Sequence, residues 1–304
     1  MLGRMILLRL SANPRAEAFV RRSRLAAGLV RRFIAGETLE QARDAVRELN
    51  AAGMSATLDH LGENVTNPDE ARASCESCLR LQRMIHDENL TANVSIKLTQ
   101  LGLDISTDLA ADHARRIVEH AHELGQFVRI DMESSAHVDR TLEIHREIWQ
   151  RRRNVGIVLQ SYLYRTDADL ESAIADGVRV RLVKGAYNEP AAVAYRNKKD
   201  VDAAFRRHAE RLLDAGDYPA IATHDERLIR ACVAYAQRRG LEASQYEFQM
   251  LYGIRRDLQE ELVRDNHPVR IYTPYGKQWY GYMMRRLAER PANLWFITKN
   301  LLRR

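Results

Sequence analysis

The sequence predicts an α/β protein in which eight parallel strands, each followed by a helix, close into a barrel. Eight short β-like runs alternate with longer amphipathic segments, and such alternation implies parallel strands joined by helical crossovers. Eight units of this kind imply closure into a (βα)8 barrel of the TIM type. A doubly wound open sheet is the competing architecture. It usually carries a glycine-rich phosphate-binding turn, but the chain contains neither GxGxxG nor the GxxxxGK pattern.

The candidate elements follow one another along most of the chain. Strands are expected at residues 55–58, 93–98, 127–132, 155–160, 178–183, 220–223, 246–251 and 268–272. Helices are expected at residues 70–88, 108–124, 138–153, 168–176, 200–215, 226–239 and 255–265. Two further helical segments, 15–33 and 39–51, precede the first strand and are expected to pack on the barrel. No linker or repeat interrupts this pattern, so residues 1–304 are expected to form one domain.

Composition and charge narrow the class of protein. Hydrophobic residues make up 45% and charged residues 29% of the chain, which is typical of folded proteins rather than disordered ones. The net charge of +6 fits a solvated arginine-rich surface, or else an anionic ligand or membrane surface. Nucleic acid is not expected as a partner, because the basic residues are scattered rather than clustered. Neither an 18-residue apolar run nor a signal peptide is expected, and the cysteine usage fits a reducing cytoplasm, so a cytoplasmic location is expected.

The three cysteines indicate neither a disulfide scaffold nor a metal site. Cys75 and Cys78 form a CxxC pair, but no second pair supplies the other half of a zinc site. Both lie in the helical stretch at residues 70–88, so they are expected to be neighbours on a helix, and no metal is expected.

Charged side chains alternate with apolar ones in several candidate strands. Ser95 and Lys97 oppose an apolar face, as do Arg129 and Asp131, because side chains point to opposite faces of a strand. The apolar face suits the helix layer, so the charged face is expected to line the barrel interior. The residues expected near the carboxyl ends of strands, where barrel enzymes have their active sites, are Lys97, Asp131, Gln160, Arg181 and Tyr272.

Two interpretations of this charged interior remain open. The residues predict an active site when they are taken together. Alternatively, ion pairs such as Asp131 with Arg129 or with Arg181 serve only to hold the barrel together, because buried charges require partners.

The segment after the eighth strand carries a polar stripe. Four side chains have the spacing i, i+3, i+4, i+7 that places them on one helix face: Tyr282, Arg285, Arg286 and Glu289. Two adjacent arginines can bind one carboxylate, so a last helix over the barrel mouth is expected. The alternative is an ordinary surface pair of arginines near a helix C-terminus.

The chain lacks two familiar catalytic motifs, so two other classes of function remain as alternatives. It contains no HExxH and no GxSxG. Lys97 or Lys184 would suit a Schiff base, as in a barrel lyase or aldolase. A basic binding protein without catalytic activity is a further alternative.

Eight sequence blocks resemble the proline dehydrogenase family. They occur in order over roughly residues 55–300, and the chain length is similar to that of the monofunctional bacterial enzymes, without an aldehyde dehydrogenase part. The blocks are SIKLTQ (95–100), RIDME (129–133), VLQSYL (158–163), RLVKGAY (181–187), ATHD (222–225), EFQMLYG (247–253), RIYTPYG (270–276) and YMMRRLAER (282–290).

The resemblance implies a set of site residues. Arg181 would lie near the N5 edge of a bound FAD, and Asp131 would orient the charged network as its catalytic partner. Glu63 would pair with Arg285 as a lid. The carboxylate of L-proline would be bound by Lys97, Arg285 and Arg286, and its ring would be walled by Tyr187, Leu251, Tyr272 and Tyr282. The FAD would also contact Met132, Gln160, Lys184, Gly185, Ala186, Thr223, His224 and Glu289.

The resemblance also implies a reaction, namely oxidation of L-proline to Δ1-pyrroline-5-carboxylate by hydride transfer from C5 to the flavin N5. This is the first step of proline catabolism to glutamate. A quinone would receive the electrons, and a pyrroline-5-carboxylate dehydrogenase would act downstream. The basic surface would suit peripheral contact with the inner membrane surface. Asn188 departs from the pattern, because some relatives carry tryptophan there.

Overall fold

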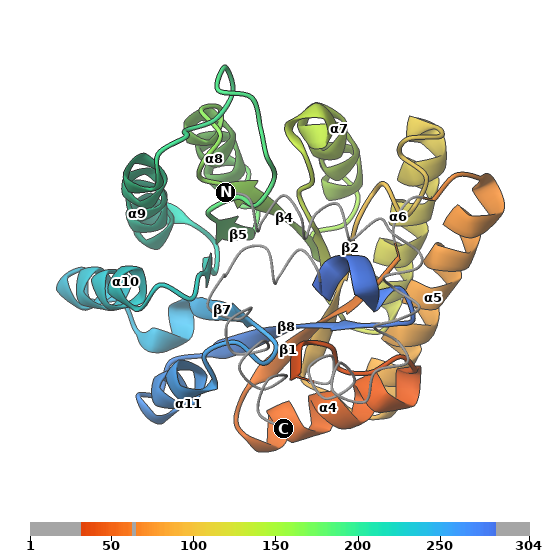
Figure 1. The fold of residues 1–304 in the computed structure, drawn as a ribbon, viewed down its shortest axis with the longest axis horizontal. Coiled ribbons are helices and arrows are strands. Elements are labelled where there is room, and N and C mark those ends of the chain that lie inside the picture. Colours follow the sequence, from red (N-terminus) through yellow and green to blue (C-terminus); the bar gives the residue numbers. More distant parts are fainter. Residues whose placement is uncertain (1–31, 63–64, 284–304) are drawn as a thin grey trace, which may run out of the picture.

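The computed structural model describes residues 32–62 and 65–283. In this part of the chain, eight parallel strands form a closed barrel in the order β1 to β8, and β8 pairs with β1 (Figure 1). The predicted fold class is therefore confirmed. The strands are β1 Ser55–His60, β2 Ala92–Ile96, β3 Val128–Ile130, β4 Val155–Gln160, β5 Val180–Val183, β6 Ala220–Ala222, β7 Glu247–Leu251 and β8 Val269–Tyr275.

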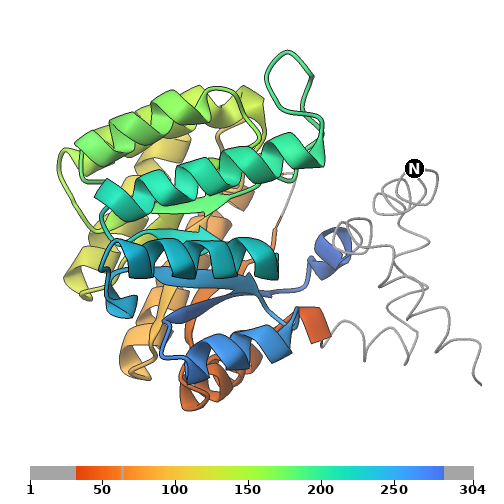
Figure 2. The same cartoon turned by 90° about the vertical axis from the view of Figure 1, so that its left-hand side faces the viewer.

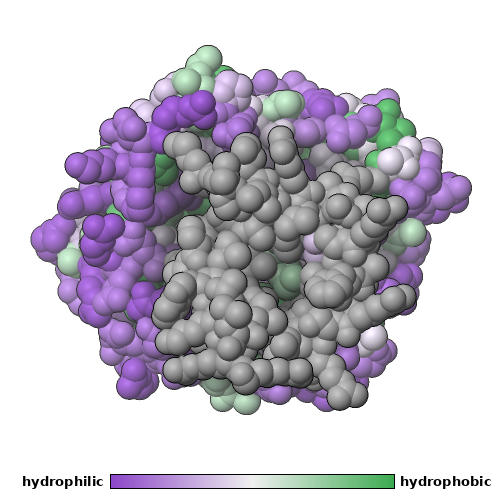
Figure 3. Space-filling model, in the orientation of Figure 1, coloured by the Kyte–Doolittle hydropathy of each residue, from purple (hydrophilic) through white to green (hydrophobic). Residues whose placement is uncertain are grey.

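Helices surround the barrel as an outer layer (Figure 1). Their outer surface is largely hydrophilic in the view of Figure 3, whereas the faces toward the strands are apolar. No helix in the described residues combines the length and the apolar character needed to cross a bilayer. The helices are α4 Leu39–Ala51, α5 Pro68–Asp87, α6 Thr107–Glu123, α7 Val138–Trp149, α8 Thr166–Ala175, α9 Lys198–Ala215, α10 Glu226–Arg238 and α11 Arg256–Arg264, with 3-10 turns η1 Ser135–His137 and η2 Ala243–Gln245.

Local signals in the sequence explain where several helices begin. Thr38 forms a capping box with Gln41 at the start of α4, which satisfies backbone groups that the first turn leaves unpaired. Asn67 caps α5, with Pro68 in the first turn. The helix expected at residues 138–153 ends earlier, because Arg151 and Arg152 both donate their backbone N–H to the Ile148 carbonyl in a closing turn.

The two ends of the barrel differ in what lies beside them. Figure 2 shows the carboxyl ends of the strands pointing toward the side that carries a helical turn at residues 279–283. Helix α4, predicted at residues 39–51, packs on β1 and β8. Most of the other predicted N-terminal helix and most of the predicted last helix lie outside the described residues.

The predicted alternation of the strands is confirmed. Val94, Ile96 and Ile130 are buried in the apolar layer between strands and helices, whereas Ser95 bonds the polar side chains inside the barrel.

Cys75 and Cys78 are free, buried cysteines on α5. Burial raises their pKa to about 11 and about 12 respectively, so both thiols stay protonated and unreactive.

A lower polar layer fills the barrel below the mouth. Arg270 forms a salt bridge with Glu247 at 3.0 Å and donates to Asn93 Oδ1 at 3.1 Å. The Thr57 hydroxyl donates to the same Asn93 oxygen at 2.7 Å. Arg129 donates to the Ile157 carbonyl at 3.0 Å. In this layer, therefore, the buried charged side chains serve to hold the strands of the barrel together.

Gly156 makes room for that layer, which predicts a stability effect. A Cβ at this position would lie 2.6 Å from Arg129 Nη1 and 2.7 Å from the Phe127 ring, and closer still to the Arg179 carbonyl oxygen. Gly156→Ala is expected to lower the free energy of unfolding by about 3 kcal/mol, the upper range for overpacking, as measured by chemical denaturation.

Gly177→Ala is the matched control for this variant. Its added Cβ meets nothing within 4 Å, although its φ of +67° adds backbone strain of about 1 kcal/mol. If Gly156→Ala unfolds no more readily than Gly177→Ala, the close-packed interior is contradicted.

Candidate active site

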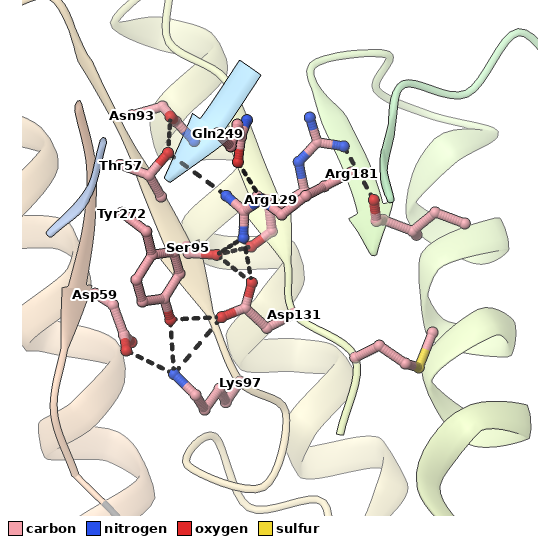
Figure 4. Close-up of polar contacts among 12 residues, drawn as sticks. Thr57, Asp59, Asn93, Ser95, Lys97, Arg129, Asp131, Arg181, Gln249 and Tyr272 are labelled. Atoms are coloured by element: carbon pink, nitrogen blue, oxygen red, sulfur yellow. Dashed lines mark hydrogen bonds and ion pairs between the residues drawn. The ribbon is translucent and has the colours of Figure 1, made fainter. Parts of the chain in front are cut away.

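Asp131 lies at the centre of a charged network at the barrel mouth (Figure 4). Its Oδ1 accepts hydrogen bonds from Arg181 Nη1 at 2.8 Å and from Ser95 Oγ at 2.5 Å. Its Oδ2 accepts from the Tyr272 hydroxyl at 2.8 Å and lies 3.6 Å from Lys97 Nζ. The residue directly follows β3, and its partners come from β2, β5, β8 and the residue after β2. One carboxylate, placed directly after β3, therefore connects side chains from three other strands or their ends.

Asp59 is the second carboxylate of this network. Its Oδ2 lies 2.7 Å from Lys97 Nζ, and Lys97 also donates to the Tyr272 hydroxyl at 3.1 Å. Asp59 is only 1% exposed, and its Oδ1 has no hydrogen-bond partner within the described residues. The network thus has two cations, Lys97 and Arg181, and two carboxylates in a buried setting.

Sequence reasoning missed Asp59 because it ended the first strand at residue 58. The strand continues to His60, so the polar alternation of Ser55 and Thr57 extends to Asp59. Extending the polar alternation by one more step along the strand predicts Asp59 on the inner face. Gln249 was also given no role, and it accepts a hydrogen bond from Arg181 Nε.

The surrounding charges shift the pKa values of Lys97, Asp131 and Tyr272. Burial alone would lower the pKa of Lys97, but the Asp59 and Asp131 charges outweigh it and hold that pKa above its ordinary value. Burial likewise opposes ionisation of Asp131, yet Arg181 and Lys97 keep the pKa of this carboxyl below its ordinary value. Burial, with the charges of Asp131 and Asp59, raises the pKa of Tyr272. The mouth therefore holds a fixed cation, a fixed anion and a neutral phenol.

This charge state argues against a Schiff-base lysine at position 97. A lysine attacks a carbonyl carbon only as the neutral amine, so lysines of this kind have lowered pKa values. The pKa of Lys97 is shifted in the opposite direction.

Asp131 pairs with Arg181 and not with Arg129, which decides between the two ion pairs considered from the sequence.

Gln160 and Met132 lie together beside the network. The Gln160 side-chain amide donates to the carbonyls of Met132 at 3.4 Å and Glu133 at 3.1 Å. Its Oε1 is buried and has no partner in the part of the chain that the structure describes. A buried acceptor without a partner is costly, so this oxygen is suited to an N–H donor from a ligand.

A second charged cluster lies at the ends of β5 and β6. Lys184 forms salt bridges with Asp202 at 2.5 Å and Asp225 at 3.2 Å. Thr223 accepts from the Asp225 backbone N–H at 3.1 Å, and His224 Nε2 accepts from the backbone N–H of Leu251 at 2.8 Å. The His224 ring is thereby fixed next to the end of β7.

Gly185 follows Lys184 in a backbone conformation that other residues avoid. Its φ is +107°, and a Cβ here would overlap the Tyr162 ring. Ala186 and Tyr187 come next and are exposed at the mouth. Tyr282, in the helical turn at residues 279–283, is partly buried, whereas Glu63, Arg285, Arg286 and Glu289 lie outside the described residues.

A separate cavity of about 690 Å³ opens at the other end of the barrel. Its lining includes Phe127, Asn154 and Arg179, which precede β3, β4 and β5. None of the predicted site residues that the structure describes lines it. The charged mouth is therefore the better candidate for an active site, as the position of active sites in barrel enzymes also indicates.

The fold and the charged mouth define an enzyme of the (βα)8 barrel class. Comparison with known proteins then specifies the family. Residues 42–299 match the family model described as proline dehydrogenase. The chain is 41% identical over 303 residues to "Proline dehydrogenase 1" of Bacillus subtilis strain 168, covering 99% of both chains. It is 40% identical over 307 residues to "Proline dehydrogenase" of Deinococcus radiodurans, covering 99% of this chain and 98% of that one.

The chain belongs to the proline dehydrogenase family and is an oxidoreductase. A solved structure of similar fold is proline utilization A of Bdellovibrio bacteriovorus inactivated by N-propargylglycine. It has a TM-score of 0.82 and 28% identity, and the match covers 90% of this chain and 33% of that one.

The position of Asp59 predicts the reactivity of Lys97. Asp59→Asn removes the nearest negative charge, so the pKa of Lys97 is expected to fall and its amine to react more readily. Treatment with pyridoxal phosphate and borohydride at pH 8, followed by peptide mass spectrometry, is expected to label Lys97 at least several-fold more in Asp59→Asn than in the wild-type protein.

Lys199 provides the internal control for this experiment, because it is an exposed lysine of α9. Its labelling is expected to be equal in both proteins. Equal labelling of Lys97 in the two proteins would contradict the pairing of Lys97 with Asp59.

Proposed function

We propose that this member of the proline dehydrogenase family oxidises L-proline to Δ1-pyrroline-5-carboxylate, with FAD accepting hydride from C5 at its N5 and a quinone receiving the electrons. The observation that carries the proposal is the buried network of Asp131, Lys97 and Arg181 at the barrel mouth. It occurs in a chain that is 40–41% identical to proline dehydrogenases over nearly its whole length.

The substrate explains why the mouth combines charge with aromatic rings. Proline is a small zwitterion, so its recognition requires fixed cations for the carboxylate and an apolar wall for the ring. We assign carboxylate binding to Lys97 with Arg285 and Arg286, because adjacent arginines fix a carboxylate by paired hydrogen bonds. The wall is assigned to Tyr272, Leu251, Tyr187 and Tyr282. When both the carboxylate and the ring of so small a molecule are held, the ring carbon that faces the flavin is also determined.

The described residues fit a flavin. When bound, FAD supplies the hydride acceptor. Gln160 Oε1, which has no partner among the described residues, offers a buried acceptor. Met132 accepts from the same Gln160 side chain, and Gly185 keeps a positive φ with its backbone against the Tyr162 ring. Arg181 remains a buried cation fixed by Asp131 and Gln249, so we assign it the stabilisation of negative charge beside the acceptor. The other cofactor contacts are assigned to Lys184, Ala186, Thr223, His224 and Glu289.

Several wider features belong to the same proposal. Residues 1–304 would act as one barrel domain, with Glu63 and Arg285 as a lid over bound substrate. The basic surface would allow peripheral contact with a membrane that holds the quinone, and the product would pass to a pyrroline-5-carboxylate dehydrogenase.

The anaerobic visible spectrum tests the proposal. The protein saturated with FAD is expected to show a flavin band that bleaches when L-proline is added, because reduction of the flavin removes this absorbance. Pyrrolidine, which lacks the carboxylate, is the control and is expected to bleach the band far more slowly. A flavin band unchanged by proline, or a protein that takes up no FAD, would contradict the proposed function.

A further inference from the structure

A buried carboxylate lies outside the network described above, in the connection between β5 and α9. Glu189 is 7% exposed, although Asn188 and Pro190 on either side are exposed. Figure 2 shows this connection extending on the side of the barrel mouth. A charged side chain turned inward between two exposed neighbours requires partners that offset its burial.

Glu189 has three such partners, which come from two other connections at the mouth. Its Oε1 accepts from the Ser135 backbone N–H at 2.8 Å and from the Tyr162 hydroxyl at 3.4 Å. Its Oε2 accepts from the Ser135 hydroxyl. Ser135 begins η1 after β3, and Tyr162 follows β4. The carboxylate therefore joins the connections that follow three neighbouring strands.

Backbone hydrogen bonds hold both ends of the same connection against the residues after β4. The Tyr162 N–H donates to the Lys184 carbonyl at 2.9 Å, and the Tyr195 N–H donates to the Tyr162 carbonyl at 2.8 Å. The Tyr164 N–H donates to Val193 at 3.0 Å. Glu189 lies between these ends, so its side chain fixes the middle of the connection.

The segments joined by Glu189 are those to which the flavin contacts are assigned. Ser135 lies three residues after Met132, and Glu189 lies three residues after Ala186. We propose that Glu189 is a positioning residue that latches the segment 185–194 to the turn after β3, and thereby holds the flavin-binding surface in shape. The proposal rests on the proposed function for the identity of the ligand, but the latch itself rests on the contacts of Glu189.

The first test measures flavin affinity. Glu189→Ala leaves the Ser135 and Tyr162 donors unpaired, and its dissociation constant for FAD is expected to rise about 10- to 100-fold, the range for losing hydrogen bonds to a charged group. Glu189→Gln keeps an oxygen that can accept from the Ser135 N–H, and its dissociation constant is expected to stay within a few-fold of wild type. Ser135→Ala, which removes only the hydroxyl donor, is expected to give an intermediate value. The matched control is Glu260→Ala, which removes an exposed carboxylate from α11.

The second test measures amide hydrogen exchange of residues 185–194 without flavin. Exchange is expected to accelerate in Glu189→Ala and not in Glu189→Gln or Glu260→Ala, with exchange in β1 and β2 unchanged as a check on the fold. Because no flavin is required, this test decides on the latch even if the wild-type protein takes up no FAD, an outcome that contradicts the proposed function alone. Unchanged exchange of residues 185–194 in Glu189→Ala would overturn the latch, as would a Glu189→Gln variant as impaired as Glu189→Ala.

Discussion

The buried carboxylate of Asp131 is the interaction on which the arrangement of the barrel mouth depends. An ionised carboxylate that is removed from water is stable only when its partners are charged or donate hydrogen bonds. Arg181, Lys97, Ser95 and Tyr272 all meet that requirement. One anion therefore fixes the direction of two cations, a hydroxyl and an aromatic ring together.

The interior of the barrel consists of polar layers with different tasks. In the lower layer, Arg270 and Glu247 satisfy each other, and Gly156 leaves space for Arg129, so this layer connects strands and leaves little for a ligand. In the upper layer, Asp59 Oδ1 and Gln160 Oε1 are buried without a partner among the described residues. Unsatisfied acceptors are unfavourable in a resting protein, and at the mouth they lie beside a charged network to which donors of a ligand could be drawn.

Much of this architecture could be predicted from the sequence, because it depends on local periodicity. The alternation of Ser95 and Lys97 with apolar neighbours correctly placed polar side chains inside the barrel, and the bounds of β4 and α4 agree with expectation. Pairing across the barrel was not predictable in the same way. Asp131 contacts Arg181, fifty positions away, and the choice between Arg129 and Arg181 depends on strand tilt and closure. Glu189 was missed for a related reason, since a loop carries no periodic signal of which side chain turns inward.

The most direct test of the central claim is a double-mutant cycle of Asp131→Asn and Lys97→Met, measured as the single-turnover rate constant for flavin reduction by proline. If one charged network positions the substrate, each single variant is expected to lose roughly 100-fold or more, and the double variant is expected to lose clearly less than the product of the two. Losses that multiply, within about a factor of two, would show that the two residues act independently. That result would contradict a network organised by Asp131.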